Sequence, residues 1–352
     1  MTVNLILIGR NALFSHYNFE RLSTLLADKD CRIDNICFFD EDKEIILPEG
    51  DGLFILCGDC SDFLSKQDAI EEDDGVFSVQ NKKLLPIMAL DDLTIKNVIL
   101  PVATRDVRPT RNTIIFRIYG KEYDETFETV SKIIKNRNKI DFSLRQNGKE
   151  SELRIRYVKN IQSLVINDVI NKIREAFLDH IYAMKDASLA KSVAHALMVS
   201  GKKIALAESF TGGGIASSLI SFPGMSKTLL ESIVCYSNDS KMSRLNVPKS
   251  VLDRNGPISA DTAFEMASGL LMETKCDIAV STTGNAGPTA ENGGPVGLFF
   301  VAIGDREAVH VFRQHYEVKN ADKKSVDDIR KEITEAGISY ALFELGRYLK
   351  NI

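Results

Sequence analysis

Long apolar runs are absent from this 352-residue sequence. No run approaches the ~18 residues that a membrane-spanning helix needs, so we expect no transmembrane segment. Residues Met1 to Ile8 have no basic segment ahead of their apolar run, which predicts a first β-strand and not a signal peptide. The formal net charge of −5 argues against general binding to nucleic acid or to an anionic membrane. We therefore expect a cytoplasmic protein whose partners include neither a membrane nor a nucleic acid.

Cysteine and histidine are also scarce, with six and five residues respectively. Six cysteines in a chain of this length do not make a disulfide framework. Cys57 and Cys60 have the C-x-x-C spacing of a redox pair and follow the apolar run 53–56. A zinc site would need two further ligands, and the sequence has no second C-x-x-C and no H-x-x-x-H. We predict ordinary buried or edge thiols, no metal site and no cofactor.

The composition, with 44% hydrophobic and 26% charged residues, is that of a globular protein, and the length suggests two to three domains. Residues 1–110 alternate between predicted strands and helices, which favours a βαβ unit with a parallel sheet. We expect a helix over 19–27 with Asn18 as its cap, and the predicted strands are 3–8, 31–38, 51–57 and 97–102.

Residues 111–160 predict a small α/β module, with a strand over 113–119 and a helix over 122–137. Strands over 140–146 and 153–158 are joined by a hairpin turn at Gly148. Residues 161–186 are expected to be a helical connector. In residues 187–352, helices are predicted over 189–199, 260–274 and 326–349, and strands over 296–303 and 308–315. These elements predict an α/β/α sandwich.

The segment 204–217 is an apolar strand, a polar hinge with Glu208 and Ser209, a run of glycines and a helix start. Open α/β sheets place their ligands at the carboxyl ends of strands, where Ser209 stands. The N–H groups of the following helix favour a phosphate or a developing oxyanion. The alternative is a turn in which Ser or Thr only caps the helix.

Two further strand ends carry polar groups. Tyr236 and Lys241 follow a predicted strand, with Asn238 or Asp239 as the expected helix cap. Thr283 and Gly284 follow a strand predicted over 277–281. If these strands are neighbours, their ends converge on one pocket.

These motifs resemble the C-terminal domain of the CinA (competence/damage-inducible) family, whose stand-alone form is nicotinamide-mononucleotide deamidase. The matching runs are Ala207–Gly213, Pro223–Ser226, Tyr236–Lys241, Asn255–Ser259, Thr283–Pro288 and Pro295–Gly297. The family usually has Cys in place of Phe210, Ile in place of Asn285 and a basic residue in place of Gly294. The insert 318–328 replaces its Gly-Asp-Arg run, with Arg330 standing for the arginine that follows.

The resemblance implies a reduced molybdopterin-binding-like domain over 1–110, a KH-like module over 111–160, the connector 161–186, and the deamidase domain over 187–352. The run Leu7–Leu13 matches the first strand of the N-terminal domain in pattern. The Gly-rich phosphate loop of that domain is replaced by Cys57–Asp62, whose two aspartates oppose a phosphate. We therefore expect the nucleotide-cleaving activity of this domain to be lost, leaving a structural or dimerising role. The module lacks the G-x-x-G loop of RNA-binding KH domains.

The resemblance further implies an amidohydrolase that converts nicotinamide mononucleotide to nicotinate mononucleotide and ammonia. Ser209 is then the nucleophile and Lys241 the base, provided that desolvation or a neighbouring cation lowers the pKa of Lys241 below ~10.4. Tyr236 is expected to share or relay the proton. The implied substrate-binding and oxyanion residues are Glu208, Thr211, Gly212, Gly213, Asn238, Thr283, Gly284, Ala286, Gly287 and Arg330.

Within that set, the N–H groups of 211–213 are the expected oxyanion donors, and the backbone of 283–287 is expected to hold the ribose phosphate. Glu208 either orients Lys241 or a substrate hydroxyl, or caps its own turn. Two other functions remain open. The C-terminal domain could be a catalytically silent binding module of the competence or DNA-damage response, or the N-terminal domain could be an ADP-ribose pyrophosphatase. A small-molecule nucleotide and a second copy in a homodimer are the expected partners.

Overall fold

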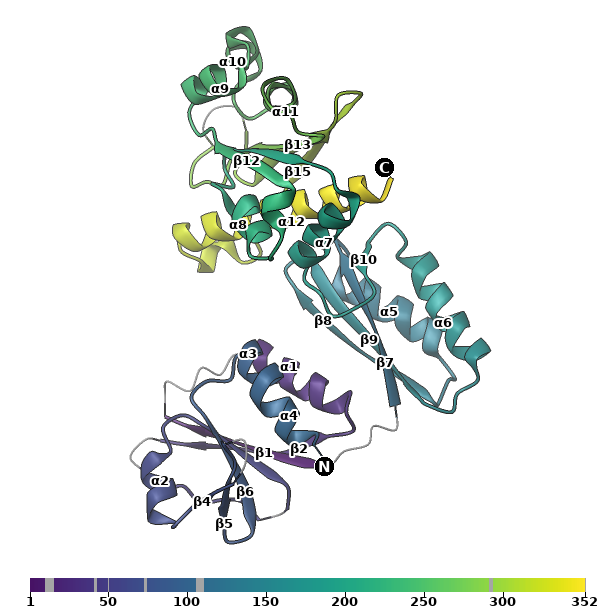
Figure 1. Cartoon of the computed structure of the whole chain (residues 1–352), viewed down its shortest axis with the longest axis vertical. Coiled ribbons are helices and arrows are strands. Elements are labelled where there is room, and N and C mark those ends of the chain that lie inside the picture. Colours follow the sequence, from purple (N-terminus) through teal and green to yellow (C-terminus); the bar gives the residue numbers. More distant parts are fainter. Residues whose placement is uncertain are drawn as a thin grey trace. The chain divides into compact units, whose positions relative to one another are not determined.

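The computed structural model describes residues 1–9, 16–40, 43–49, 51–72, 75–105, 111–290 and 294–351. The protein is a mixed α/β chain with three β-sheets (Figure 1). It divides into two compact units, one of residues 1–114, 132–143 and 154–171, and the other of residues 115–131, 144–153 and 172–352. Among the helices of the described residues, none combines the length and the apolar character needed to cross a bilayer.

The N-terminal sheet has the strand order β2-β1-β3-β6-β5-β4, in which β1, β2, β3 and β6 are parallel. Its strands are β1 (Thr2–Ile8), β2 (Arg32–Phe39), β3 (Leu53–Cys57), β4 (Ile70–Glu71), β5 (Phe77–Val79) and β6 (Lys82–Ile87). Its helices are α1 (His16–Ala27), α2 (Ser61–Lys66), α3 (Asp92–Thr94), the π-helical turn η2 (Ile95–Ile99) and α4 (Leu100–Ala103). The predicted βαβ pattern is confirmed.

Two predictions in this region were wrong. The segment 97–102 is helical, because Asp91 caps α3 through the Thr94 N–H, and the buried Ile95 and Ile99 recur at helical spacing. The fourth parallel strand is β6 instead. The helix α1 begins at His16, so Asn18 lies inside it and is not its cap. Of the matched run Leu7–Leu13, residues 10–13 lie outside the described residues.

Cys57 and Cys60 stand where β3 ends and α2 begins, the position of a redox pair. Cys57 packs on one face of the sheet with Leu5 and Ile55, and Cys60 packs on the other face with Phe54. Burial raises the pKa of both thiols, which makes them weaker nucleophiles than an exposed thiol. The prediction of ordinary buried thiols is confirmed.

The middle sheet has the order β10-β7-β9-β8. Its elements are β7 (Arg111–Tyr119), α5 (Tyr123–Ile134), β8 (Ile140–Asn147), β9 (Glu150–Val158), α6 (Ser163–Ala176) and β10 (Ile181–Ala183). The predicted hairpin turn is present, with Gly148 at a positive φ of 57°. The segment 161–186 was predicted as a helical connector, but it also contains a strand, because β10 pairs with β7.

The C-terminal sheet has the order β12-β11-β13-β14-β15. Its strands are β11 (Ile204–Glu208), β12 (Leu229–Val234), β13 (Ile278–Gly284), β14 (Leu298–Gly304) and β15 (Val309–His315). Its helices are α7 (Leu189–Ser200), α8 (Gly214–Ile220), α9 (Asn238–Leu245), α10 (Lys249–Asn255), α11 (Ala260–Glu273) and α12 (Val326–Asn351), with the 3₁₀ turns η3 (Met225–Lys227) and η4 (Ala321–Lys323).

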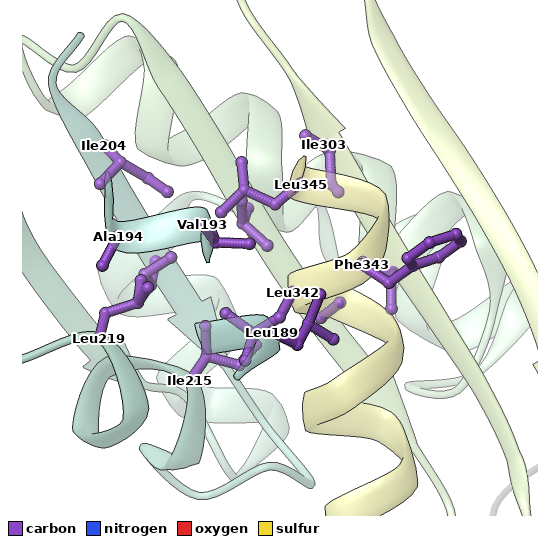
Figure 2. Packing of buried hydrophobic residues seen from close by; sticks show 14 of the residues in the cluster. Leu189, Val193, Ala194, Ile204, Ile215, Leu219, Ile303, Leu342, Phe343 and Leu345 are labelled. Carbon is purple, nitrogen blue, oxygen red and sulfur yellow. The ribbon is translucent and has the colours of Figure 1, made fainter. Parts of the chain in front are cut away.

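Alternating side chains of β11 supply both layers of the core. Ile204 and Leu206 face α7, α8 and α12, while Ala205 and Ala207 face α9, α10 and α11. Figure 1 shows these two sets of helices on opposite sides of the sheet, and Figure 2 shows Val193, Ile215 and Leu342 meeting in the first layer. Each fully buried aliphatic side chain stabilises the fold by about 2 kcal/mol. The predicted three-layer α/β/α sandwich is confirmed.

The carboxyl ends of β11, β12 and β13 lie at the same edge of the sheet, because these three strands run in the same direction. β11 pairs in parallel with both β12 and β13, whereas β14 and β15 are antiparallel to their neighbours. The chain goes from β11 to one side for β12 and returns to the other side for β13. This reversal is the switch point at which open α/β sheets bind their ligands.

Candidate active site

Residues from three neighbouring strand ends surround one cleft at this edge. Ser209 follows β11 directly, and its N–H donates to the Thr282 carbonyl on β13 at 3.1 Å. Lys241 lies on α9, which follows β12. The expected convergence is confirmed. The cleft has a volume of about 510 Å³ and is lined by Ser209, Phe210, Tyr236, Lys241, Pro257, Ile258, Thr283, Gly284, Asn285, Ala286, Gly287, Pro288, Thr289 and Arg330.

Lys241 is a buried lysine that contacts Ser209. Its side chain is 1% exposed, and its Nζ donates to Ser209 Oγ at 3.1 Å. The same Nζ donates to the carbonyls of Cys235 at 2.8 Å and Tyr236 at 3.3 Å. Burial lowers the pKa of Lys241 to about 8. Desolvation is therefore the cause of the lowered pKa, since it penalises the charged ammonium.

The local sequence explains how Lys241 comes to face Ser209. Ser237 caps α9, because its hydroxyl accepts the Ser240 N–H at 3.1 Å. The expected caps Asn238 and Asp239 are instead the first residues of the helix. With the cap at Ser237, Lys241 lies one turn inside α9, and its N–H completes a bond to the Ser237 carbonyl. Asn238 is exposed and does not line the cleft.

Glu208 caps the helix α8. Its buried carboxylate accepts the N–H groups of Gly213, Ile215 and Ala216 at 3.0–3.1 Å, and also the Ser232 hydroxyl. The alternative in which Ser209 or Thr211 caps this helix is wrong. The N-cap residue is Gly213, and the carboxylate that accepts the N–H groups at the helix start belongs to Glu208. A carboxylate therefore occupies the helix start that was expected to hold a phosphate or oxyanion.

In the turn between β11 and α8, fewer backbone N–H groups are available as oxyanion donors than expected. The Gly212 N–H donates to the Ser209 carbonyl at 3.1 Å, and the Gly213 N–H is taken by Glu208. Thr211 does not line the cleft, and its hydroxyl pairs with that of Thr282 at 2.8 Å. Within the described residues, the backbone N–H groups of Phe210 and Ala286 have no protein acceptor, and both residues line the cleft.

At the third strand end, that of β13, polar groups are also hydrogen-bonded to other groups of the protein. The Thr283 hydroxyl donates to the Pro257 carbonyl at 2.6 Å. Gly284 allows β14 to approach closely, since a Cβ there would lie 2.5 Å from the Cβ of Phe299. The Gly287 N–H donates to Asn285 Oδ1 at 2.8 Å. The Ala286 N–H, one of the groups expected to hold a phosphate, makes no backbone hydrogen bond to another described residue.

Arg330, at the start of α12 after the insert 318–328, crosses the cleft mouth. Its Nη1 donates to the Gly287 carbonyl, and its Nη2 donates to the Tyr236 hydroxyl at 2.8 Å. The Tyr236 side chain is 64% exposed. The structure thus places the Tyr236 carbonyl at Lys241 and the Tyr236 hydroxyl at Arg330, so the expected proton relay through the hydroxyl has no direct hydrogen bond to Lys241.

Sequence reasoning assigned no role to several lining residues, namely Phe210, Pro257, Ile258, Asn285, Pro288 and Thr289. Pro257 and Ile258 lie within one of the matched runs, so the run itself was the signal that could have placed them. Asn285 and Phe210 were noted as departures from the family pattern. Among the described residues, no group of His, Cys, Asp and Glu side chains has the arrangement of a metal site.

Comparison with known proteins covers the half of the chain that carries the cleft. Residues 186–347 match the family model of the CinA C-terminal domain. A CinA-like protein from Kosmotoga olearia is 35% identical over 198 residues, which cover 54% of this chain and 47% of that protein. The chain spans about half the length of the curated relatives that it matches.

Two solved structures are similar to part of this chain. The competence/damage inducible protein CihA from Agrobacterium tumefaciens is 33% identical, with 46% of this chain and 93% of that chain covered and a TM-score of 0.41. A CinA superfamily protein from Klebsiella pneumoniae is 26% identical, with 47% of this chain and 97% of that chain covered and a TM-score of 0.42.

Proposed function

Because residues 186–347 form a CinA C-terminal domain, we propose that this chain is an amidohydrolase that converts nicotinamide mononucleotide to nicotinate mononucleotide and ammonia. The observation that carries the proposal is the buried Lys241, whose pKa is lowered to about 8 and whose Nζ lies 3.1 Å from Ser209 Oγ in a cleft. A serine beside a lysine that can lose its proton is a recognised nucleophile and base pair.

The contacts of Lys241 suit both of its protonation states. A neutral amine has two N–H groups, which the carbonyls of Cys235 and Tyr236 accept, and its lone pair then faces the Ser209 hydroxyl. The protonated ammonium donates to all three oxygens. The side chain therefore keeps one position while it takes up and returns a proton.

The reaction follows from these groups in two steps. In the first, Lys241 takes the Ser209 proton while Oγ bonds to the carboxamide carbon. The carbonyl oxygen becomes an oxyanion, for which we propose the N–H groups of Phe210 and Ala286 as donors, and losing one such donor typically costs about 3 kcal/mol of transition-state stabilisation. Ammonia then leaves with the proton of Lys241, and an acyl ester on Ser209 remains. In the second step, water gives a proton to Lys241 as its oxygen bonds to the ester carbon. The bond from that carbon to Ser209 Oγ then breaks, Lys241 returns the proton to Oγ, and nicotinate mononucleotide leaves.

Arg330 is the group that we propose for the phosphate. Among the described residues that line the cleft, the cations are Lys241 and Arg330, and a guanidinium suits a phosphate better than a lysine does. The cleft volume of about 510 Å³ is in the range of sites for small molecules.

The test is release of ammonia from nicotinamide mononucleotide by the purified full-length chain, with Ser209→Ala as the matched control. We expect turnover in the first and none in the second. A folded chain that releases no ammonia from this substrate would refute the proposed activity. Nicotinamide riboside, which lacks the phosphate, should be a much poorer substrate if Arg330 binds that group.

For the N-terminal domain we propose that the nucleotide-cleaving activity is lost. Asp59 Oδ1 accepts both the N–H and the hydroxyl of Ser61 at the start of α2, which places a carboxylate where a phosphate loop would be needed. Metal-dependent release of AMP from ADP-ribose by the full-length chain would contradict this.

A further inference from the structure

Asn285 stands at the point where β13 leaves the sheet. The residue is 9% exposed, and its backbone extends the pairing with β14. Its N–H donates to the Leu298 carbonyl at 2.8 Å, and its carbonyl accepts the Gly297 N–H at 2.8 Å. The backbone of Asn285 is therefore fixed by the sheet, which gives its side chain a rigid base.

The carboxamide of Asn285 uses all of its strong hydrogen-bonding groups on the backbone that follows. Its Oδ1 accepts the Gly287 N–H at 2.8 Å, and its Nδ2 donates to the carbonyls of Thr289 at 2.8 Å and Gly294 at 3.1 Å. An amide side chain has one acceptor and two donors, and each is matched here. The side chain thus ties three backbone groups to the end of β13.

Through Gly287, the same side chain acts on the mouth of the cleft. The N–H of Gly287 is held by Asn285, and its carbonyl accepts Nη1 of Arg330. Arg330 in turn donates to the Tyr236 hydroxyl. The position of the guanidinium therefore depends on Gly287, whose N–H side is held by Asn285 and whose carbonyl lies in the next peptide unit. The Gly287 N–H, being occupied, is not a donor for the substrate.

We propose that Asn285 is a positioning residue for substrate binding, which holds Gly287 through its N–H so that the Gly287 carbonyl places Arg330 at the anionic end of the substrate. This rests on the proposed function, because the anion is the phosphate of the proposed substrate. Among the described residues, Asn285 makes no hydrogen bond to Ser209 or Lys241, so we expect its main effect on substrate binding. Ala286, whose N–H we propose for the oxyanion, lies between Asn285 and Gly287, so a smaller effect on the chemical step is expected as well.

The kinetic test compares Asn285→Leu, which keeps a similar volume and removes all three hydrogen bonds, with Asn285→Ala, which avoids a branched side chain in a tight site. We expect KM for nicotinamide mononucleotide to rise about tenfold or more in both, and kcat to fall by a clearly smaller factor, since an affinity loss acts mainly on KM. The control is Ser188→Ala, which removes the cap of α7 and lowers stability with no change in KM. An unchanged KM, or an equal loss in kcat, would overturn the proposal.

Hydrogen exchange measured by mass spectrometry tests the same proposal without turnover. Peptides that contain Gly287 should exchange faster in both Asn285 variants than in the wild type and in Ser188→Ala. Equal exchange in all four proteins would overturn the positioning role even if the chain hydrolyses the proposed substrate. Conversely, a chain that fails to hydrolyse it, yet shows the faster exchange, would refute the proposed function and retain the role of Asn285 in holding the loop.

Discussion

The junction from β3 to α2 and the junction from β11 to α8 are built from the same parts. Each lies at the carboxyl end of a parallel strand, each carries a side chain able to act as a nucleophile, and each has a carboxylate on the start of its helix. At the first junction these groups are Cys57 and Asp59, and at the second they are Ser209 and Glu208. They differ in what the neighbouring strands supply.

At the second junction, the strand next to β11 leads into α9 and delivers Lys241 to the hydroxyl of Ser209. At the first junction, burial is the main factor and raises the pKa of the Cys57 thiol, and the nearby Cys60 raises it further. A hydrogen bond from the Leu90 backbone lowers it, but the net result is a raised pKa. A thiol that stays protonated is a poor nucleophile. The position at the end of a strand is thus common to both, whereas the reactive partner depends on the adjacent strand.

The largest expected effect comes from separating Ser209 from Lys241. Ser209→Ala and Lys241→Ala should each reduce kcat by a factor on the order of 10³ or more, and the double variant should be little worse, because groups that act as a unit are strongly non-additive. Lys241→Arg should fail too, since a guanidinium keeps its proton at working pH. The measurement is ammonia release. Near-normal turnover of Lys241→Arg would show that Lys241 is not the base and is not what distinguishes the second junction from the first.

The second effect is on pH dependence. Lys241 works as a base only when neutral, and its pKa of about 8 lies below the usual 10.5. The fraction of neutral lysine rises with pH up to about 8, so kcat/KM should fall about tenfold for each pH unit below this value and level off above it. A profile from pH 6.5 to 9.5 measures this. A profile that is flat between pH 6.5 and 8 would contradict a lysine base.

The third effect concerns stability. Glu208→Gln keeps the shape of the side chain but replaces one carboxylate oxygen with an NH₂ group. This donor then faces a buried backbone N–H whose hydrogen bond Glu208 accepts in the native protein. We expect a loss of roughly 1–3 kcal/mol in the free energy of unfolding, because a buried donor left without an acceptor costs about that much. Thermal unfolding of the C-terminal domain measures it. Unchanged stability would mean that α8 does not depend on its carboxylate.

Local sequence patterns were enough to predict most of the fold and to place Ser209 and Lys241 at converging strand ends. They failed at 97–102, where a short apolar run fits a strand or a helix equally well and the cap at Asp91 decided the outcome. They left two roles open for Glu208, because a carboxylate next to a nucleophile looks the same in sequence whether it faces a substrate or a helix start; the hydrogen bonds confirm that it caps its own turn. The hydrogen bonds of Asn285 join residues on both sides of a loop, and no periodicity in the sequence reports such contacts.

The smallest effect is expected from Asp59→Asn, which makes at the first junction the same change that Glu208→Gln makes at the second. Asp59 is on the surface, and hydrogen bonds from Ser61 lower the pKa of its carboxylate. An asparagine oxygen can accept the same bonds, and water is available to any group that is left without a partner. The melting temperature should therefore stay within the error of the measurement, and turnover should be unchanged. Asp59 accepts one N–H and one hydroxyl, whereas the buried Glu208 accepts three N–H groups and one hydroxyl. A loss as large as that of Glu208→Gln would therefore show that neither burial nor the number of accepted N–H groups is what separates the two junctions.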